Sequence, residues 1–241
     1  AQLTTRNSQL NPMFWQEDPS DTKYQVPDEI IDLLFSIDCK RIPVDHAYAL
    51  SHALHDAVSW LADEPGASVH PVHVAGSQNG WERPEHGTDQ LLLLSRRTKL
   101  TIRVPKRRAD ELQRQLTGRT LDIAGCAMTI GQAKERHLSA ETTIFSRYVA
   151  SPDDGDEDAF LRWAANELNK LDIRMRKALC GKSTVLQTPN GDLHTRSLMV
   201  AELHPREAVR LQQVGLGPNR RMGCGIFIPH KGIEAVGKGN G

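Results

Sequence analysis

The residues best suited to proton transfer lie near the start of a predicted helix. Apolar residues recur there at helical spacing behind Asp45, a typical N-cap residue: Ala47, Leu50, Leu54, Val58 and Leu61. His46 falls in the first turn, at the border of this apolar face. A helix N-terminus disfavours a charged imidazole, so the ring would stay neutral and able to accept a proton. General acid–base catalysis by His46 is one interpretation, and a histidine that packs at the core boundary is the other.

Three further polar side chains lie on this predicted helix. Tyr48 lies two residues after His46 and roughly 200° around the helix, so it shares a site with His46 only if loops reach it. His52 and His55 fall well away from the apolar face and are expected to be solvated.

A glycine-rich stretch near the C-terminus has the composition of an anion-binding loop. Residues 215–231 contain four glycines and the adjacent pair Arg220 and Arg221, followed by an apolar run. Glycine brings backbone N–H groups close to a ligand, and successive N–H groups in a turn form a concavity that binds anions. Arginine adds a planar fork that suits phosphate. The alternative is a helix C-cap with a tight turn into a strand.

Charge is distributed unevenly along the 241 residues, although the net charge is zero. Residues 1–90 hold 5 Lys and Arg against 14 Asp and Glu, whereas the remainder holds 25 against 16. Such asymmetry is typical of nucleic-acid contact. Four scattered cysteines form no CxxC pair, so we expect reduced thiols in a cytoplasmic protein. No apolar run approaches the roughly 18 residues that span a bilayer, and no secretory signal is evident, so no membrane partner is expected.

The order of predicted elements favours an α+β fold with two tandem ferredoxin-like (βαββαβ, RRM-like) domains. In the first, strands at 29–37, 90–95, 98–104, 120–123 and 126–130 surround helices at 45–61 and 105–116. In the second, strands at 142–149, 173–180, 193–203 and 225–229 surround a helix after the acidic run at 153–158 and another at 205–214. The predicted divisions are an extended arm (1–27), an N-terminal domain with the candidate catalytic helix (28–136), a C-terminal domain with the glycine-rich loop (137–233) and a flexible tail (234–241).

Motifs for metal or cofactor chemistry are missing from the sequence. There is no HExxH, Walker lysine or GxSxG, and no carboxylates at metal-binding spacing. We therefore expect neither a metal nor a cofactor. A nuclease made of these parts would need RNA, because a 2′-OH can attack the adjacent phosphate once a base removes its proton. Aromatic residues make up 5%, so contacts to phosphate are favoured over base stacking. The residues predicted to bind RNA are Arg96, Arg97, Lys99, Arg107, Arg108, Arg114, Gly217, Arg220, Arg221, Gly223, Gly225 and Lys231.

Four segments together resemble the CRISPR repeat-processing endoribonucleases of the RAMP superfamily, most closely the subgroup named for myxobacterial-type CRISPR loci. The segments are Val44–Leu50 (VDHAYAL), Leu92–Leu100 (LLLSRRTKL), Ser197–Val200 (SLMV) and Gly215–Lys231. The resemblance extends from about residue 28 to residue 233. It implies two ferredoxin-like domains and metal-independent cleavage of precursor CRISPR RNA within each repeat, leaving a 2′,3′-cyclic phosphate and a 5′-OH.

The resemblance also implies site residues and partners. The family histidine maps onto His46, and the second catalytic residue stays open among Tyr48, His52, Arg97 and Lys99. The partners implied are CRISPR repeat RNA, whose 3′ hairpin is retained after cleavage, and other subunits of a type I-like effector complex. A non-catalytic subunit that holds guide RNA in such a complex is the alternative, with His46 purely structural.

Overall fold

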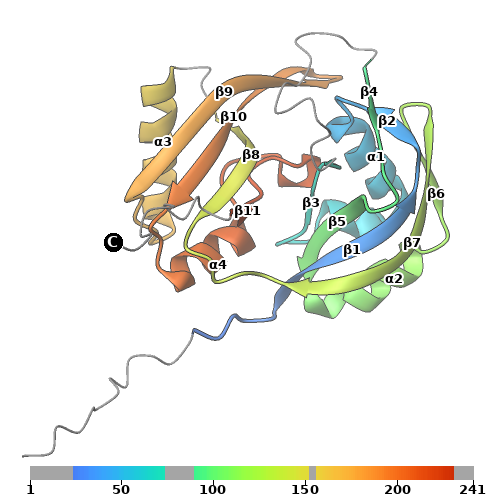
Figure 1. The fold of residues 1–241 in the computed structure, drawn as a ribbon, viewed down its shortest axis with the longest axis horizontal. Coiled ribbons are helices and arrows are strands. Elements are labelled where there is room, and N and C mark those ends of the chain that lie inside the picture. The colour runs from blue at the N-terminus through green and yellow to red at the C-terminus, as the bar shows by residue number, and fades with distance from the viewer. Residues whose placement is uncertain (1–23, 74–89, 152–155, 231–241) are drawn as a thin grey trace, which may run out of the picture.

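The described part of the chain forms two main antiparallel sheets, each with two α-helices, and a small two-stranded sheet. This computed structural model describes residues 24–73, 90–151 and 156–230. In that part of the chain, the first sheet contains five strands in the order β3-β5-β1-β7-β6, and the second contains four in the order β11-β8-β10-β9. Figure 1 shows the two sheets with β3 and the turn η3 (Arg220–Met222) beside one another between them. The predicted arm at 1–27 lies outside the described residues up to residue 23, as does the tail at 234–241.

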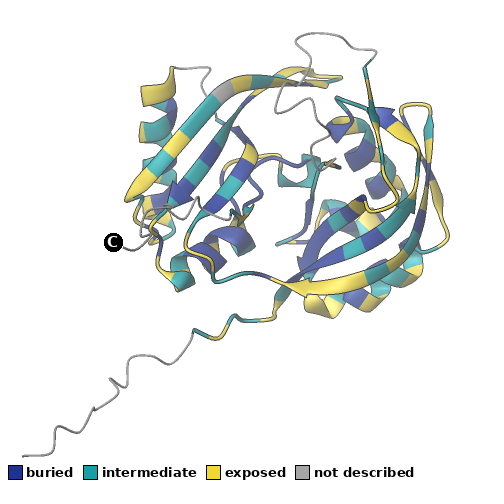
Figure 2. Cartoon of the chain, in the orientation of Figure 1, coloured by how far each residue is buried: buried dark blue, intermediate teal, exposed yellow. Residues whose placement is uncertain are grey.

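The first sheet has the strand order of a ferredoxin-like unit, with β6 added at one edge. Its elements are β1 (Ile30–Asp38), α1 (Ala47–Ala57), β3 (Ser68–Val69), β5 (Lys99–Pro105), α2 (Ala109–Leu116), β6 (Thr120–Ile123) and β7 (Cys126–His137). Alternation places Ile31, Leu33 and Phe35 of β1 in the core, where the apolar faces of both helices also gather (Figure 2). The unit thus packs its helices on one face of its sheet, as the period-two and helical patterns predict.

Three boundaries in this unit differ from the sequence predictions, the first being the strand expected at 126–130, which continues to His137 as β7. The strand expected at 90–95 is β4 (Leu91–Leu93), which pairs only with β2 (Arg41–Pro43) in a separate two-stranded sheet. The edge position expected for it belongs to the two-residue strand β3. The first helix ends at Ala57 rather than near residue 61, and a 3₁₀ turn, η1 (Ser59–Ala62), follows. Val58 and Leu61 are nevertheless buried, so the apolar periodicity outlasts the helix.

The second sheet repeats the ferredoxin-like order. Its elements are β8 (Ile144–Ala150), α3 (Glu157–Lys170), β9 (Lys177–Thr188), β10 (Gly191–Ala201), α4 (Pro205–Val214) and β11 (Ile228–Pro229). Local chemistry sets the helix starts: Asp156 caps α3 by accepting from the Ala159 N–H at 2.8 Å, and Pro205 occupies the first position of α4. The predicted α+β class with tandem ferredoxin-like units is confirmed.

A β-bulge lets strand β8 contribute to two cores. Arg147 and Tyr148 together lie opposite the single residue Ser197 of β10, because the register shifts there. Ile144 and Val149 consequently face the core under α3 and α4. Tyr148 and Ala150 face a second, smaller cluster that joins the units, together with Ala47, Leu186 and Cys224. The start of α1 thereby packs against the second sheet.

Candidate active site

The start of α1 lies between the two units. His46, not the predicted Asp45, is the N-cap residue, and its side chain makes no capping hydrogen bond. The Asp45 carboxylate instead accepts a hydrogen bond at 2.7 Å from the backbone N–H of Gln187 in β9. Asp45 has this partner because α1 contacts β9 in the fold, a relation that residue spacing does not reveal.

His46 is buried and bonded to backbone groups on both sides of its ring. His46 as a whole is 3% exposed. Nδ1 lies 2.8 Å from the Pro43 carbonyl oxygen, and Nε2 lies 2.9 Å from the backbone nitrogen of Val72. A carbonyl only accepts and an N–H only donates, so Nδ1 carries the proton and Nε2 is the acceptor. The neutral imidazole therefore ties the segment before α1 to the segment after β3.

Other polar side chains form a second stripe on α1, made of Tyr48, His52 and His55. Their spacing of four and three residues places them on one helix face. The rings of Tyr48 and His52 are 5.9 Å apart, and Tyr48 is 36% exposed. Nδ1 of His52 lies 3.0 Å from the Asp56 carboxylate, and the His52 side chain is 59% exposed. Unlike His46, His52 therefore has a ring that faces solvent. The expectation of a solvated ring is wrong for His55, which is partly buried and whose Nε2 is buried without a hydrogen-bond partner among the described residues.

The glycine-rich loop begins where α4 ends and returns against the first unit. Gly215 is the C-cap of α4, and the Leu216 N–H donates to the Gly225 carbonyl at 3.1 Å, which closes the loop. Gly223 approaches the first unit so closely that a Cβ there would lie 2.4 Å from a carbon of Pro71. Of the glycines predicted to contact RNA, Gly217 is exposed, but Gly223 and Gly225 are buried and contact protein instead. The cap-and-turn interpretation describes this backbone.

The side chains of the two adjacent arginines of the loop, Arg220 and Arg221, point in different directions. Arg220 Nη2 donates to the Gln213 carbonyl at 2.9 Å and lies 3.4 Å from Ser68 Oγ. Burial, with the nearby charges of Arg103 and Arg221, lowers the pKa of Arg220 to about 10. The phosphate contact predicted for Arg220 would require it to leave these partners. Within the described ranges, Arg221 has no hydrogen-bond or ion-pair partner.

Arg221 acts electrostatically on His55 of α1. Burial lowers the pKa of His55, and the charges of Arg221 and then His52 lower it further, whereas Asp56 and Asp63 raise it. Because α1 contacts η3, His55 of α1 lies close to Arg221 of the loop, although helix and loop belong to different units. An imidazole whose pKa is lowered, lying next to a cation, suits proton transfer beside a bound phosphate.

The remaining predicted cations divide into paired and unpaired groups. Arg107 and Arg108 both bind the buried Glu64 carboxylate, and Arg108 also lies over the Trp60 ring. Arg114 donates weakly to the backbone of its own helix. Three exposed cations, none with an ion pair among the described residues, lie at the turn between β4 and β5: Arg96, Arg97 and Lys99. Lys231 lies outside the described residues.

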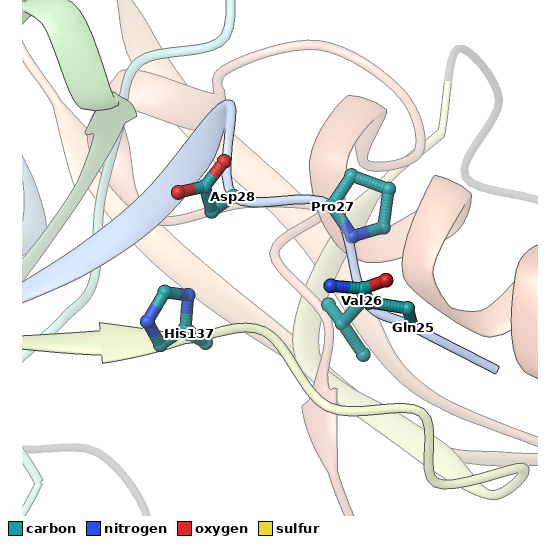
Figure 3. A pocket seen from close by; sticks show the side chains of 5 residues that line it. All are labelled: Gln25, Val26, Pro27, Asp28 and His137. Carbon is teal, nitrogen blue, oxygen red and sulfur yellow. The ribbon is translucent and has the colours of Figure 1, made fainter. Parts of the chain in front are cut away.

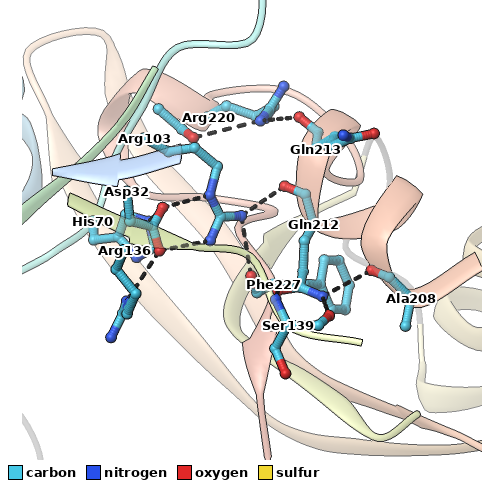
Figure 4. Close-up of polar contacts among 11 residues, drawn as sticks. Asp32, His70, Arg103, Arg136, Ser139, Ala208, Gln212, Gln213, Arg220 and Phe227 are labelled. Carbon is cyan, nitrogen blue, oxygen red and sulfur yellow. Dashed lines mark hydrogen bonds and ion pairs between the residues drawn. The ribbon is translucent and has the colours of Figure 1, made fainter. Parts of the chain in front are cut away.

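Sequence reasoning missed a buried charge network between the units. Arg103 of β5 is 0% exposed and binds Asp32 of β1 through two nitrogens, at 2.7 and 3.2 Å (Figure 4). The same guanidinium donates to the carbonyls of Gln212 and Phe227 in the second unit. Burial alone would raise the pKa of Asp32, but Arg103 and His70 hold it well below its usual range. The sequence signal for this network was a charged residue in the interior of each of two apolar strands, Asp32 in β1 and Arg103 in β5. These two residues lie opposite one another in the ladder.

A hollow in the described surface is not lined by the residues predicted to form the site. This open hollow at the start of β1 is lined by Gln25, Val26, Pro27, Asp28 and His137, none of them a predicted site residue (Figure 3). In the described ranges, no three His, Cys, Asp or Glu side chains gather closely enough to hold a metal ion. The described helices include none that is long and apolar enough to cross a membrane.

Comparison with known proteins decides the family. The family model described as Cas6 Crispr matches residues 31–232. The chain belongs to the Cas6 family. A curated relative from Myxococcus xanthus (strain DK1622), named CRISPR-associated endonuclease Cas6, is 28% identical over 199 residues, covering 83% of this chain and 81% of the relative. This confirms the resemblance identified from the sequence.

Solved structures confirm the Cas6 fold independently of sequence identity. A structure named CRISPR associated protein Cas6 has a TM-score of 0.58 at 10% identity, over 84% of this chain and 100% of that one. A Cas6-related protein from Pyrococcus furiosus has a TM-score of 0.55 at 14% identity, over 82% and 97% of the two chains. At these identities the likeness concerns the fold alone.

Proposed function

We propose that this Cas6 protein is a metal-independent endoribonuclease that cleaves precursor CRISPR RNA within its repeats. The observation that carries the proposal is the meeting of α1 with the glycine-rich loop, which brings histidines and Arg221 together from different units. Membership of the Cas6 family, and the name endonuclease borne by the Myxococcus xanthus relative, support the substrate and the reaction class.

The proposed chemistry needs only side chains and the RNA itself. An imidazole accepts the proton of the 2′-OH, whose oxygen attacks the adjacent phosphorus. The bond to the 5′-oxygen breaks, and that oxygen takes up a proton from water, while the imidazolium returns its proton to solvent, which leaves a 2′,3′-cyclic phosphate and a 5′-OH. Arg221 lies where it could stabilise the additional negative charge on the phosphate. No step in this scheme requires a cofactor.

The family resemblance and the geometry favour different residues for proton transfer. The family resemblance assigns it to His46, with Tyr48 as a second candidate. His46 would have to release the Val72 N–H before Nε2 could accept a substrate proton. His52 lies on the same helix, faces solvent and has its other nitrogen beside Asp56. His46 thus stays the family-based assignment, and His52 is the residue with an accessible ring.

A cleavage assay tests both the reaction and the residue. Repeat RNA is incubated in EDTA with the wild type and with His46→Gln, Tyr48→Phe and His52→Ala, and product ends are analysed for cyclic phosphate. Loss of wild-type cleavage in EDTA would refute the metal-independent mechanism. Full activity of His46→Gln would refute the role of His46. Loss in His52→Ala, with unchanged thermal unfolding, would move the assignment to His52.

A non-catalytic guide-RNA-binding subunit is the second candidate function, and one observation favours it. Both ring nitrogens of His46 are bonded to backbone groups, as expected of a purely structural histidine. A single-turnover assay with excess protein separates the two functions. Binding of the repeat hairpin without any cleavage supports the second, and cleavage at any measurable rate excludes it.

The same proposal includes partners and location. We infer that the protein keeps the 3′ hairpin of its product and joins other subunits of a type I-like effector complex in the cytoplasm. Arg96, Arg97 and Lys99 supply exposed charge for that RNA. Co-elution of cleaved RNA with the protein in gel filtration is the expected result, and rapid release of both fragments would contradict it.

A further inference from the structure

A single buried guanidinium connects the first unit to both ends of the glycine-rich loop. Nη1 of Arg103 donates to the carbonyl of Gln212 at 2.6 Å and to that of Phe227 at 3.1 Å. Gln212 lies three residues before Gly215, where the loop begins, and Phe227 lies two residues after Gly225. Figure 4 shows the guanidinium between these two carbonyls. The Arg103 side chain therefore hydrogen-bonds to the backbone at both the beginning and the end of the loop.

Two of the last carbonyls of α4 are satisfied by arginine side chains. The last carbonyls of a helix lack intrahelical partners. Arg103 satisfies that of Gln212, and Arg220 satisfies that of Gln213. Positive charge is also favourable at a helix C-terminus. Arg103 reaches this position from the other unit, so the first unit supplies part of the cap of a helix in the second.

Asp32 fixes the direction of Arg103. It lies opposite Arg103 in the β1–β5 ladder and binds Nε and Nη2, which leaves Nη1 directed at the loop ends. The Asp32 carboxylate also accepts from Arg136 at 3.0 Å, and His70 lies 3.6 Å away. Bidentate geometry of this kind holds a guanidinium in one orientation.

We propose that Arg103, oriented by Asp32, is a positioning residue that keeps the glycine-rich loop in its RNA-binding shape. The proposal rests on the proposed RNA-binding function of that loop. Arg103 itself touches no RNA, because it is fully buried. Its contribution is to present Arg221 and the exposed Gly217 from a loop whose two ends cannot separate. RNA affinity should consequently depend on Arg103 more than the cleavage step does.

Variants of Arg103 separate positioning from general stability. Arg103→Lys keeps the charge next to Asp32, but a lysine ammonium lacks the planar fork that reaches the carboxylate and both carbonyls together. Asp32→Leu combined with Arg103→Met replaces the ion pair by apolar groups, a change that buried pairs often tolerate without loss of stability. Arg136→Ala is the matched control, since it removes another partner of Asp32 that does not reach the loop.

The first measurement is single-turnover cleavage of repeat RNA over a range of protein concentrations. For Arg103→Lys and the double variant, we expect the half-saturating concentration to rise about tenfold. The maximal rate should fall by a smaller factor, because Arg221 also faces the phosphate that reacts. The salt slope of binding should fall by about 1 for the lost Arg221 contact. Arg136→Ala should match the wild type. A double variant that unfolds cooperatively and binds like the wild type would overturn the proposal, as would a fall in the maximal rate alone.

Hydrogen exchange of the RNA-free protein distinguishes this inference from the function on which it rests. Amides between Gly215 and Gly225 should exchange faster in the Arg103 variants than in the wild type, whereas those of β1 and β7 should not. Unchanged exchange in the loop would refute the positioning role. Faster loop exchange in a protein whose wild type neither binds nor cleaves repeat RNA would refute only the proposed function.

Discussion

Replacing Gly225 with alanine should damage the loop far more than the same replacement at a free turn. Gly225 has φ +64°, and a Cβ there would lie 1.9 Å from the carbonyl oxygen of Leu216. That oxygen belongs to backbone, so no flexible side chain can move aside. Gly225 also donates to the Tyr148 carbonyl at 2.6 Å and accepts from the Leu216 N–H at 3.1 Å, and both bonds resist a shift.

The expected cost has two parts that a matched control separates. A left-handed backbone costs an alanine about 1 to 2 kcal/mol. Overpacking against fixed atoms adds about 1 to 3 kcal/mol. Gly125, at the β6–β7 turn, has φ +81°, but a Cβ there would meet no atom within 4 Å, so Gly125→Ala should show only the first part. Both free energies of unfolding are measured by urea denaturation. Equal losses in the two variants would refute the steric argument, and RNA affinity should fall only in Gly225→Ala.

Three further predictions concern charge, pH and thiol reactivity. Arg221→Ala should lower the salt slope of RNA binding by about 1, whereas Arg107→Ala should change it less because Glu64 already pairs with Arg107; equal slopes between 50 and 200 mM salt would contradict this. Burial would raise the pKa of Glu207, but hydrogen bonds from Arg176 and two backbone N–H groups lower it to about 2 from 4.5. Its folded pKa is depressed, so Glu207 contributes up to about 3 kcal/mol above pH 4.5, lost as pH falls towards 2. Glu207→Gln should therefore flatten the acid limb of the stability profile, and an unchanged limb would count against it. Burial raises the pKa of the Cys224 thiol to about 12, so Cys224 should resist alkylation until the protein unfolds, and labelling in the native state would show otherwise.

Local patterns were sufficient to predict most of the fold. Alternating apolar residues indicated β1, and a proline at the first helical position together with a terminal glycine indicated α4 with nearly correct ends. These signals work because each lies within one element. No bounds were predicted for the short strand β3, since two residues carry almost no periodicity.

The candidate site was harder to predict because its contacts are distant in sequence. The burial of His46 depends on Val72, which lies 26 residues later. Arg220 and Arg221 are neighbours with the same chemistry, yet the turn at η3 directs one towards Gln213 and leaves the other without a partner in the described chain. Residue type and spacing do not encode such a difference.

The bulge in β8 is the place where this strand can lose one residue without changing which later side chains face the core. Arg147 and Tyr148 occupy the space of one residue opposite Ser197, and everything after them faces the opposite side from a regular continuation. Deleting Arg147 would leave Tyr148 alone opposite Ser197 and return the strand to simple alternation. Val149 would still lie opposite Arg196, and Ala150 opposite Thr195, so both would keep their present faces. Deleting Phe145 instead, with the strand regular, would turn Arg147 towards the core under α3 and α4. Homologous chains aligned at this strand should therefore differ in length at the bulge more readily than elsewhere in β8.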